Sequence, residues 1–387
     1  MSEWLGKGRK ARRCYGFDEI ALVPGEVTLN PDEVDISWKL GDIKLDIPII
    51  ASAMDGVVDP KFAVAMGNHG GMAVLNLEGI QTRYEDTESI LKEISESSNE
   101  KATELVQKLY TQPVREDLIS KRIEEIKKQN VLCAVSSIPQ KCEKYGQIAQ
   151  EAGCDAFFVQ STVTTVRHIA TAYKVVDFKD FCSSMKIPVV VGNCVTYKVT
   201  LELMETGVAG LLIGIGPGAA CTTRGVLGIG VPQVTATVDA AAAREFYFKK
   251  TGRYVPIITD GGMSTGGDVC KALASGSDAV MVGSAFARAE EAPGGGFHWG
   301  MATPHANLPR GTRIRVGTTG TLEEILYGPA RLDDGTQNLV GAIRTCMGNV
   351  GTKNLREFQL TEIIIAPSIQ TEGKVFQSAQ KVGMGKK

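Results

Sequence analysis

The sequence predicts an α/β fold, a single (β/α)8 TIM barrel, and three observations support this. Eight short apolar runs recur along the chain, segments with helical spacing separate them, and most runs end in Ser, Asn, Asp or Gly. Nearly continuous apolar runs are typical of parallel strands that are buried on both faces. Polar residues gathered at strand carboxyl ends favour a barrel over a doubly wound sheet, which is the alternative interpretation of the same pattern.

The eight expected strands are, in chain order, PIIAS (48–52), GMAVLN (71–76), LCAVSS (132–137), AFFVQS (156–161), PVVVGN (188–193), GLLIGI (210–215), VPIITD (255–260) and AVMVGS (279–284). Helices are expected between them, for example in PKFAVAMGNHG after the first, KVTLELMETG after the fifth and GDVCKALASG after the seventh. The chain of 387 residues, 43% of them hydrophobic, is long enough for one barrel domain over 1–387.

Three segments depart from the simple alternation of strand and helix. Residues 80–130 are charged and too long for one helix, so they predict a small helical insertion after the second strand. The Gly- and Pro-rich stretch 285–325 lacks periodicity, which is typical of a functional loop, and we expect an active-site flap over 295–318. Residues 366–387 predict a C-terminal tail that is either mobile or ordered by a partner.

Composition excludes several classes of function. A net charge of −2 gives no strong field for nucleic acid, and no apolar run is long enough to cross a membrane. The basic N-terminus precedes no apolar stretch, so it does not predict a secretory signal. Nine cysteines and four histidines show no metal-ligand spacing, and reduced thiols in a cytoplasmic protein are the simplest interpretation.

The densest chemical signal is GIGPGAACTTRG (214–225), at the end of the sixth expected strand. Its glycines Gly214, Gly216 and Gly218 permit unusual backbone angles, so their carbonyls could line a cation site or their N–H groups an anion site. Cys221 follows on the active face of the barrel and is a candidate nucleophile. The alternative is a cysteine packed in a tight turn, and Thr223 either supports the thiol or only caps the next helix.

Two glycine-rich loops follow the last two expected strands, where barrels commonly bind phosphate. Asp260 could bind ribose hydroxyls, and Gly262, Gly283 and Ser284 are candidate phosphate contacts, although ordinary turns have the same composition. The segment 297–316 contains two histidines and three arginines, so it is either a surface loop or a lid that brings an Arg or His to the chemistry.

Taken together, these segments resemble a known family, that of IMP dehydrogenase and GMP reductase. The resemblance rests on motifs in the family's order, namely DEIALVP (18–24), IPIIASAMD (47–55), GGMAVLN (70–76), VVGNCVT (190–196), GIGPGAACTTR (214–224), IITDGG (257–262), MVGSAF (281–286), EAPG (291–294) and CMGNVG (346–351). It implies that Cys221 attacks C2 of a purine nucleotide. In the dehydrogenase the adduct gives hydride to NAD and water releases XMP, whereas the reductase converts GMP to IMP with NADPH.

The resemblance also implies which residues form the site. The substrate contacts it implies are Ser52, Met54, Asn193, Asp260, Gly262, Gly283, Ser284, His298, Gly300, Met301 and Ala302. The cofactor contacts are Gln160, Ser161, Asn193 and Gly214. Potassium would be held by carbonyls of Gly216, Gly218 and Cys221 and, from a neighbouring subunit, by Glu372 and Gly373. A homotetramer that can pair into an octamer follows from that shared site.

The chain departs from the family pattern in several places. Ala219 stands where most members have a phosphate-binding Ser, and His298 where they have a Tyr that contacts phosphate. Gln160 replaces the acidic residue that ends the fourth strand and contacts the cofactor. The segment 80–130 is too short for the paired regulatory repeats of many IMP dehydrogenases, so regulation through those repeats is not expected.

The choice between the two family reactions depends on the flap. Arg310 stands where the reductase has the glutamate that handles ammonia, so the sequence favours IMP dehydrogenase. The Arg-Tyr pair of the dehydrogenase flap is also missing, and Arg310 or Arg313 is the candidate to activate water. GMP reductase is the alternative. A non-catalytic nucleotide-binding regulator is the second alternative, and the intact Cys221 loop argues against it.

Overall fold

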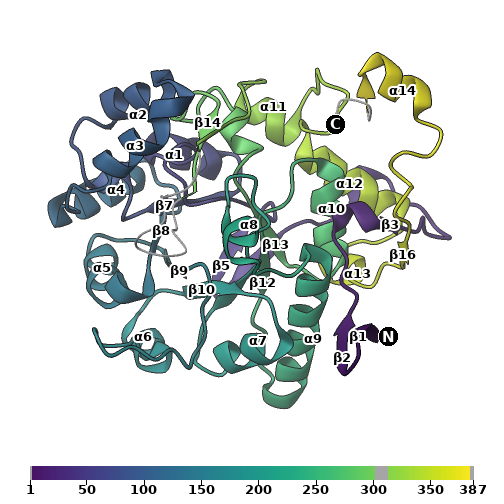
Figure 1. Cartoon of the computed structure of the whole chain (residues 1–387), viewed down its shortest axis with the longest axis horizontal. Coiled ribbons are helices and arrows are strands. Elements are labelled where there is room, and N and C mark those ends of the chain that lie inside the picture. Colours follow the sequence, from purple (N-terminus) through teal and green to yellow (C-terminus); the bar gives the residue numbers. More distant parts are fainter. Residues whose placement is uncertain (1, 301–312, 384–387) are drawn as a thin grey trace.

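The computed structural model describes residues 2–300 and 313–383, and its centre is a closed parallel barrel (Figure 1). The barrel strands are β6 (Ile49–Ala51), β7 (Met72–Asn76), β8 (Ala134–Ser137), β9 (Ala156–Gln160), β10 (Val189–Cys194), β11 (Gly210–Ile213), β12 (Ile257–Asp260) and β13 (Ala279–Val282). Each lies within one of the eight expected runs, except that β10 extends one residue beyond its run. The predicted TIM barrel is confirmed.

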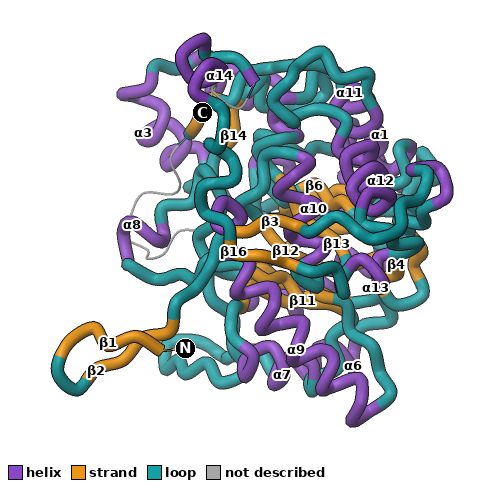
Figure 2. Tube along the Cα trace, turned by 90° about the vertical axis from the view of Figure 1, so that its right-hand side faces the viewer, coloured by secondary structure: helices purple, strands orange, loops and turns teal. Residues whose placement is uncertain are grey.

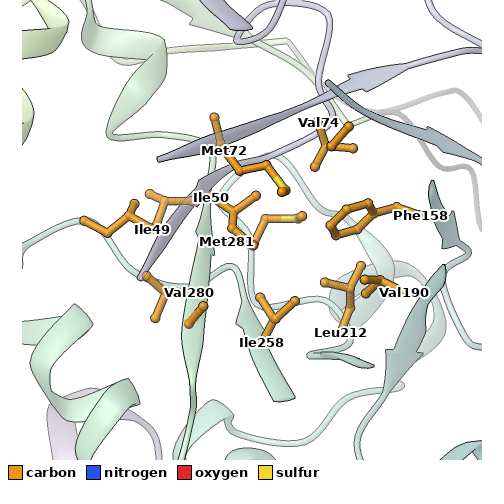
Figure 3. Close-up of a cluster of buried hydrophobic side chains, with 14 of the residues drawn as sticks. Ile49, Ile50, Met72, Val74, Phe158, Val190, Leu212, Ile258, Val280 and Met281 are labelled. Atoms are coloured by element: carbon orange, nitrogen blue, oxygen red, sulfur yellow. The ribbon is translucent and has the colours of Figure 1, made fainter. Parts of the chain in front are cut away.

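The barrel interior is a packed core, and its register determines what lies above it. Side chains including Ile50, Phe158, Leu212, Ile258 and Met281 gather in this core (Figure 3). Successive side chains of a strand alternate between its two faces. The residues two positions further along these strands therefore also face inward, and they are Ser52, Gln160, Gly214, Asp260 and Gly283. The polar ends of the apolar runs thus form the floor of the space above the core.

Helices surround the barrel on the outside (Figure 1). They are α1 (Pro60–Asn68), α4 (Glu116–Lys127), α5 (Pro139–Glu151), α6 (Phe178–Ser184), α7 (Tyr197–Met204), α9 (Gln233–Thr251), α10 (Gly266–Ala274) and α12 (Leu339–Asn349). Side-chain caps fix where several of them begin: Asp59 accepts from the N–H of Phe62, and Thr265 accepts from that of Asp268. The three helices expected from periodicity are present.

The segment 80–130 divides into two parts. Helices α2 (Thr87–Glu96) and α3 (Asn99–Leu109), with the 3₁₀ turn η3 (Ile80–Thr82), share a small hydrophobic core of their own. Helix α4 packs instead against α1 and α5, in the position of the barrel helix between β7 and β8. The predicted insertion over 80–130 was therefore too wide, because the charged surface of α4 concealed the apolar face that covers the barrel.

Smaller elements lie outside the barrel sheet and its ring of helices. Strands β1 (Ser2–Gly6) and β2 (Arg9–Arg12) form a hairpin that projects from the body (Figure 2). Other short pairs are β4 (Trp38–Leu40) with β5 (Ile43–Leu45), β3 (Ile20–Leu22) with β16 (Ile363–Ile365), and β14 (Phe297–His298) with β15 (Ile314–Arg315). The remaining helices are α8 (Thr223–Leu227), α11 (Leu322–Tyr327), α13 (Leu355–Phe358) and α14 (Val375–Gln380), with 3₁₀ turns η1 (Phe17–Glu19), η2 (Pro31–Glu33) and η4 (Phe286–Arg288). Within residues 2–300 and 313–383, no helix has the length and apolarity to cross a membrane.

Candidate active site

A cavity of about 770 Å³ lies over the carboxyl ends of the barrel strands. Most of the predicted site residues line it, contributed by six of the strand ends and by the segment that follows η4. They are Ser52, Met54, Gln160, Ser161, Asn193, Gly214, Gly216, Gly218, Cys221, Thr223, Asp260, Gly262, Gly283, Ser284, His298 and Gly300. The structure thus brings together residues that are up to 248 positions apart in the sequence, counted from Ser52 to Gly300.

The glycine-rich loop after β11 presents the thiol to this cavity. Gly214 has a φ of 147°, and a Cβ there would lie 2.4 Å from the carbonyl oxygen of Asp260, so only glycine fits. Cys221 is exposed, and its Sγ lies 3.3 Å from the hydroxyl oxygen of Thr223, the first residue of α8. The buried Thr223 hydroxyl is therefore the acceptor for the thiol proton in this arrangement.

Arg224 serves the shape of this loop rather than the thiol. Its Nε donates to the carbonyl of Ile215 at 3.2 Å, and its Nη2 donates to that of Val231 at 2.8 Å. Burial lowers the pKa of the Arg224 guanidinium, and the nearby Cys221 acts in the opposite direction. Arg224 thus joins both ends of the loop that carries Cys221.

Asp260 and Asn193 form a polar pair at the bottom of the cavity. The Asn193 Nδ2 donates to the Asp260 carboxylate at 2.8 Å. Burial raises the pKa of Asp260 to about 6, and the Asn193 hydrogen bond offsets part of this shift because it favours the ionised form. Asp260 is partly exposed to the cavity, and a carboxylate with spare lone pairs can accept hydrogen bonds from a diol such as ribose.

Backbone groups of the loops after β12 and β13 line the cavity beside this pair. Gly262 has a φ of 82° in the loop after β12, and a Cβ on Gly283 would lie 2.9 Å from the sulfur of Met54. The hydroxyl of Ser284 lies 3.0 Å from Nε2 of His298. Burial lowers the pKa of His298 to about 4, with a smaller contribution from the charge of Arg288. His298 Nδ1 is buried and has no hydrogen-bond partner among the described residues.

Other predicted residues lie away from the cavity or outside the described residues. Arg313 does not line the cavity, since its guanidinium donates to carbonyls and side chains at the end of α2 and start of α3. The structure thus does not bring the Arg313 guanidinium to Cys221, in contrast to the predicted role in water activation. Glu372 and Gly373 do not line the cavity of their own chain. Met301, Ala302 and Arg310 lie outside the described residues.

A second lobe of the cavity was not predicted. It extends from the Cys221 loop toward the ends of β7 and β8 and the N-terminus of α5. Its lining includes Asn76, Glu78, Arg83, Pro113, Val114, Ser136, Ser137, Ile138, Lys141, Tyr145 and Thr162. Glu78 accepts from the N–H of Ile138 at 3.0 Å, so it caps α5. Asn76 and the serine pair, which end the second and third apolar runs, were the signals of this lobe. Arg83 and Val114 come from the segment 80–130 and were not recognisable as site residues.

The comparisons with known proteins agree with this fold. The profile of the IMP dehydrogenase / GMP reductase domain matches residues 14–375. The chain therefore belongs to the IMP dehydrogenase / GMP reductase family, and it is an oxidoreductase of that family by its relatives. An uncharacterized oxidoreductase of Mycobacterium leprae is 37% identical, over 94% of this chain and 99% of its own length.

Relatives with a named activity are more distant. The inosine-5'-monophosphate dehydrogenase of Cryptosporidium parvum is 31% identical over 91% of this chain and 90% of its own length. Among solved structures, an IMP dehydrogenase/GMP reductase-like protein from Corynebacterium glutamicum superposes with a TM-score of 0.88 at 34% identity, over 94% of this chain and 97% of the other. These likenesses establish the family and the fold, and the family includes both dehydrogenase and reductase reactions.

Proposed function

We propose that this protein is an NAD-dependent IMP dehydrogenase, which oxidises IMP to XMP through a covalent adduct on Cys221. The observation that carries the proposal is the position of the thiol. Cys221 lines the same cavity as Asp260, Asn193 and the glycine-rich loops after β12 and β13. A nucleotide held by its ribose and phosphate at that end would extend its base toward the thiol.

The reaction can be written on these residues. The thiol of Cys221 loses its proton, and the sulfur adds to C2 of the base. NAD, when bound, accepts the hydrogen of C2 with two electrons as hydride. Water then adds at C2 and the C–S bond breaks, which yields XMP and the free thiol. The sum is IMP, NAD⁺ and water to XMP, NADH and a proton.

Substrate binding uses the groups around the thiol. The Asp260 carboxylate, oriented by Asn193, accepts hydrogen bonds from the ribose hydroxyls. The loops at Gly262, Gly283 and Ser284 offer N–H groups to the phosphate. Because burial lowers its pKa, His298 is neutral, so only one of its two ring nitrogens carries a hydrogen to donate. The nucleotide is thus held mainly by neutral donors and one carboxylate.

The cavity has room for a dinucleotide beside the substrate. Gln160, Ser161, Asn193 and Gly214 line it between the thiol and the second lobe, so they would hold the nicotinamide half of NAD. The lobe around Glu78 and Lys141 would hold the remainder. The residues present fit this group, because ribose hydroxyls and pyrophosphate need both acceptors and donors.

A monovalent cation would bind at carbonyl oxygens of the loop that carries Cys221. Gly216 and Gly218 offer carbonyl oxygens, which suit a hard cation, but the Gly218 carbonyl already accepts from the N–H of Cys221 at 2.9 Å. Glu372 and Gly373 would complete the site from a neighbouring copy, which requires a homotetramer or a larger assembly. The exposed side chains of Val375 and Phe376, just beyond them, support such a contact because they present apolar surface.

Mass spectrometry of the intact protein tests the covalent step directly. Wild-type protein mixed with IMP and NAD and quenched during turnover should carry a nucleotide adduct that maps to Cys221. The Cys221→Ala variant is the control and should carry none. A wild-type protein that turns over IMP without any adduct would contradict nucleophilic catalysis by this thiol.

A further inference from the structure

A small second core joins the insertion to the strand that carries His298. Its fully or largely buried members are Ile80, Leu91, Ile94, Val106, Leu109, Tyr110 and Trp299. Trp299 is the one member from outside the segment 80–110, and its side chain is 0% exposed. It lies between His298 and Gly300, which both line the cavity. The insertion therefore holds a residue at the edge of the substrate site.

Buried hydrogen bonds connect this core to the loop after β6. The hydroxyl of Tyr110 donates to the carboxylate of Asp55, and it accepts from Nε1 of Trp299 at 2.9 Å. Asp55 also accepts from the N–H of Ile80 at 2.6 Å, and it directly follows Met54 in the sequence. One hydroxyl thus links the loop of Met54, the insertion and the strand of His298.

Two glycines in this region leave no room for a side chain of their own. A Cβ on Gly79 would lie 1.9 Å from the Asp55 carboxylate, and one on Gly56 would lie 2.6 Å from the carbonyl oxygen of Phe297. Arg313 directly precedes the partner strand β15. Its guanidinium donates a hydrogen bond to the carbonyl of Ser95 at 3.1 Å and lies over the ring of Phe297. Both strands of the β14–β15 hairpin are therefore attached to the insertion.

We propose that Tyr110 is a positioning residue for the nucleotide site, and this inference rests on the proposed function. Its hydroxyl fixes His298 and Gly300 relative to Met54 and Ser284. Without it, the Trp299 N–H and one side of the Asp55 carboxylate lose a buried partner, and the hairpin can shift against the loop. Cys221 lies on a different element, the loop after β11, which the barrel itself positions. Loss of the hydroxyl should therefore weaken nucleotide binding and leave the chemical step intact.

The Tyr110→Phe variant tests this proposal, with Tyr84→Phe as its matched control. Tyr84 packs against the same small core, but its hydroxyl donates to the carbonyl of Leu109 at 2.9 Å, within the insertion. In Tyr110→Phe the Kd of IMP by calorimetry and the KM of IMP should both rise about tenfold, as expected for the loss of a hydrogen bond to a charged group. The kcat should stay within about twofold. Tyr84→Phe should change neither constant by more than about twofold.

A second variant separates positioning from general destabilisation. Trp299→Phe removes the donor to Tyr110, so the double variant with Tyr110→Phe should bind IMP no more weakly than the worse single variant. Fully additive losses, or equal losses in Tyr110→Phe and Tyr84→Phe, would overturn the proposal. So would wild-type affinity for IMP in Tyr110→Phe. A wild-type protein that binds no IMP would instead reject the proposed function, which the wild-type titration alone reveals.

Discussion

The two walls of the cavity are built in different ways. The strand-end wall consists of the loops after β11, β12 and β13, residues 214–223, 260–264 and 283–284. Short segments that directly follow buried strands supply it. Arg224 fixes its shape through two hydrogen bonds and Asn193 through one. The insertion wall is lined by Glu78, Arg83, Pro113, Val114, His298 and Gly300, and the segments that carry them depend on a separate small core and on long-range contacts.

This difference separates the groups that touch the substrate directly from those that position a wall indirectly. The strand-end wall holds the thiol of Cys221 and the half-buried carboxylate of Asp260 on the barrel, whose strand register sets their direction. The insertion wall holds His298 through Trp299, Tyr110 and Asp55, which all lie outside the barrel sheet. Variants of the first wall should therefore affect the chemical step at Cys221 or the direct contacts to ribose and phosphate, whereas variants of the second should affect binding and stability and leave the chemical step intact.

The largest effect is expected at Cys221. Cys221→Ala and Cys221→Ser should lower kcat by a factor of about 10³ or more, because a hydroxyl cannot replace the thiolate without a strong base. IMP binding, measured by calorimetry, should remain within a few-fold of the wild-type protein. Either variant retaining more than a few per cent of the wild-type rate would remove the thiol from the chemistry of this wall.

Asp260→Asn should give the next largest effect, through the pH dependence of binding. Burial raises the pKa of Asp260 to about 6, so the carboxylate forms as the pH rises through that value. Wild-type affinity for IMP should increase over this range, since only the carboxylate accepts from both ribose hydroxyls. The asparagine variant should bind IMP about tenfold or more weakly near neutral pH. Nucleotide phosphate also titrates at about pH 6. The quantity to measure is therefore the difference in IMP affinity between the wild-type protein and Asp260→Asn at each pH.

The same shift predicts the stability of the ligand-free protein. A carboxyl group whose folded pKa lies above its unfolded value stabilises the fold at low pH, and this contribution is lost as the pH rises from about 4 to about 6. By urea unfolding, the free energy of unfolding of the wild-type protein minus that of Asp260→Asn should therefore decline over this range, because only the wild-type protein carries the carboxyl group. A difference that does not change with pH would show that the pKa of Asp260 is not raised in the folded protein.

Replacement of potassium should have a smaller effect on the strand-end wall. With the carbonyls of Gly216 and Gly218 among the ligands, rates in potassium should exceed those in sodium or a bulky organic cation by several-fold. The Cys221 loop is the part of this wall that would depend on the cation. Equal rates in all three salts would remove the cation from the proposed site.

The smallest effect is expected at Arg313, on the insertion wall. Arg313→Ala should lower the free energy of unfolding by about 1–2 kcal/mol, because it removes several hydrogen bonds to α2 and α3. The ratio of hydride transfer to hydrolysis should not change, in contrast to a role in water activation. A burst of NADH followed by a slow steady state in this variant would restore Arg313 to the chemistry.

The sequence predicted the strand-end wall better than the insertion wall, for physical reasons. Ser52 and Asp260 are the last residues of apolar runs, and the two-residue alternation of a strand decides whether such a residue faces the barrel interior or the surrounding helices. Tyr110 and Trp299 meet across 189 positions, and no local pattern encodes that contact. The lobe that Arg83 and Lys141 line likewise depends on the packing of the insertion beside α5, and no local sequence pattern encodes that packing. Helix α4 was assigned to the insertion because charge on its outer face dominates its composition.

The direction of the reaction tests the central claim most directly. The purified protein, in potassium buffer, is given IMP with NAD and, separately, GMP with NADPH, and the products are identified by chromatography. The account predicts XMP and NADH from the first mixture and no IMP from the second. Conversion of GMP to IMP as the sole activity would contradict it, because the same thiol would then serve the reductase reaction.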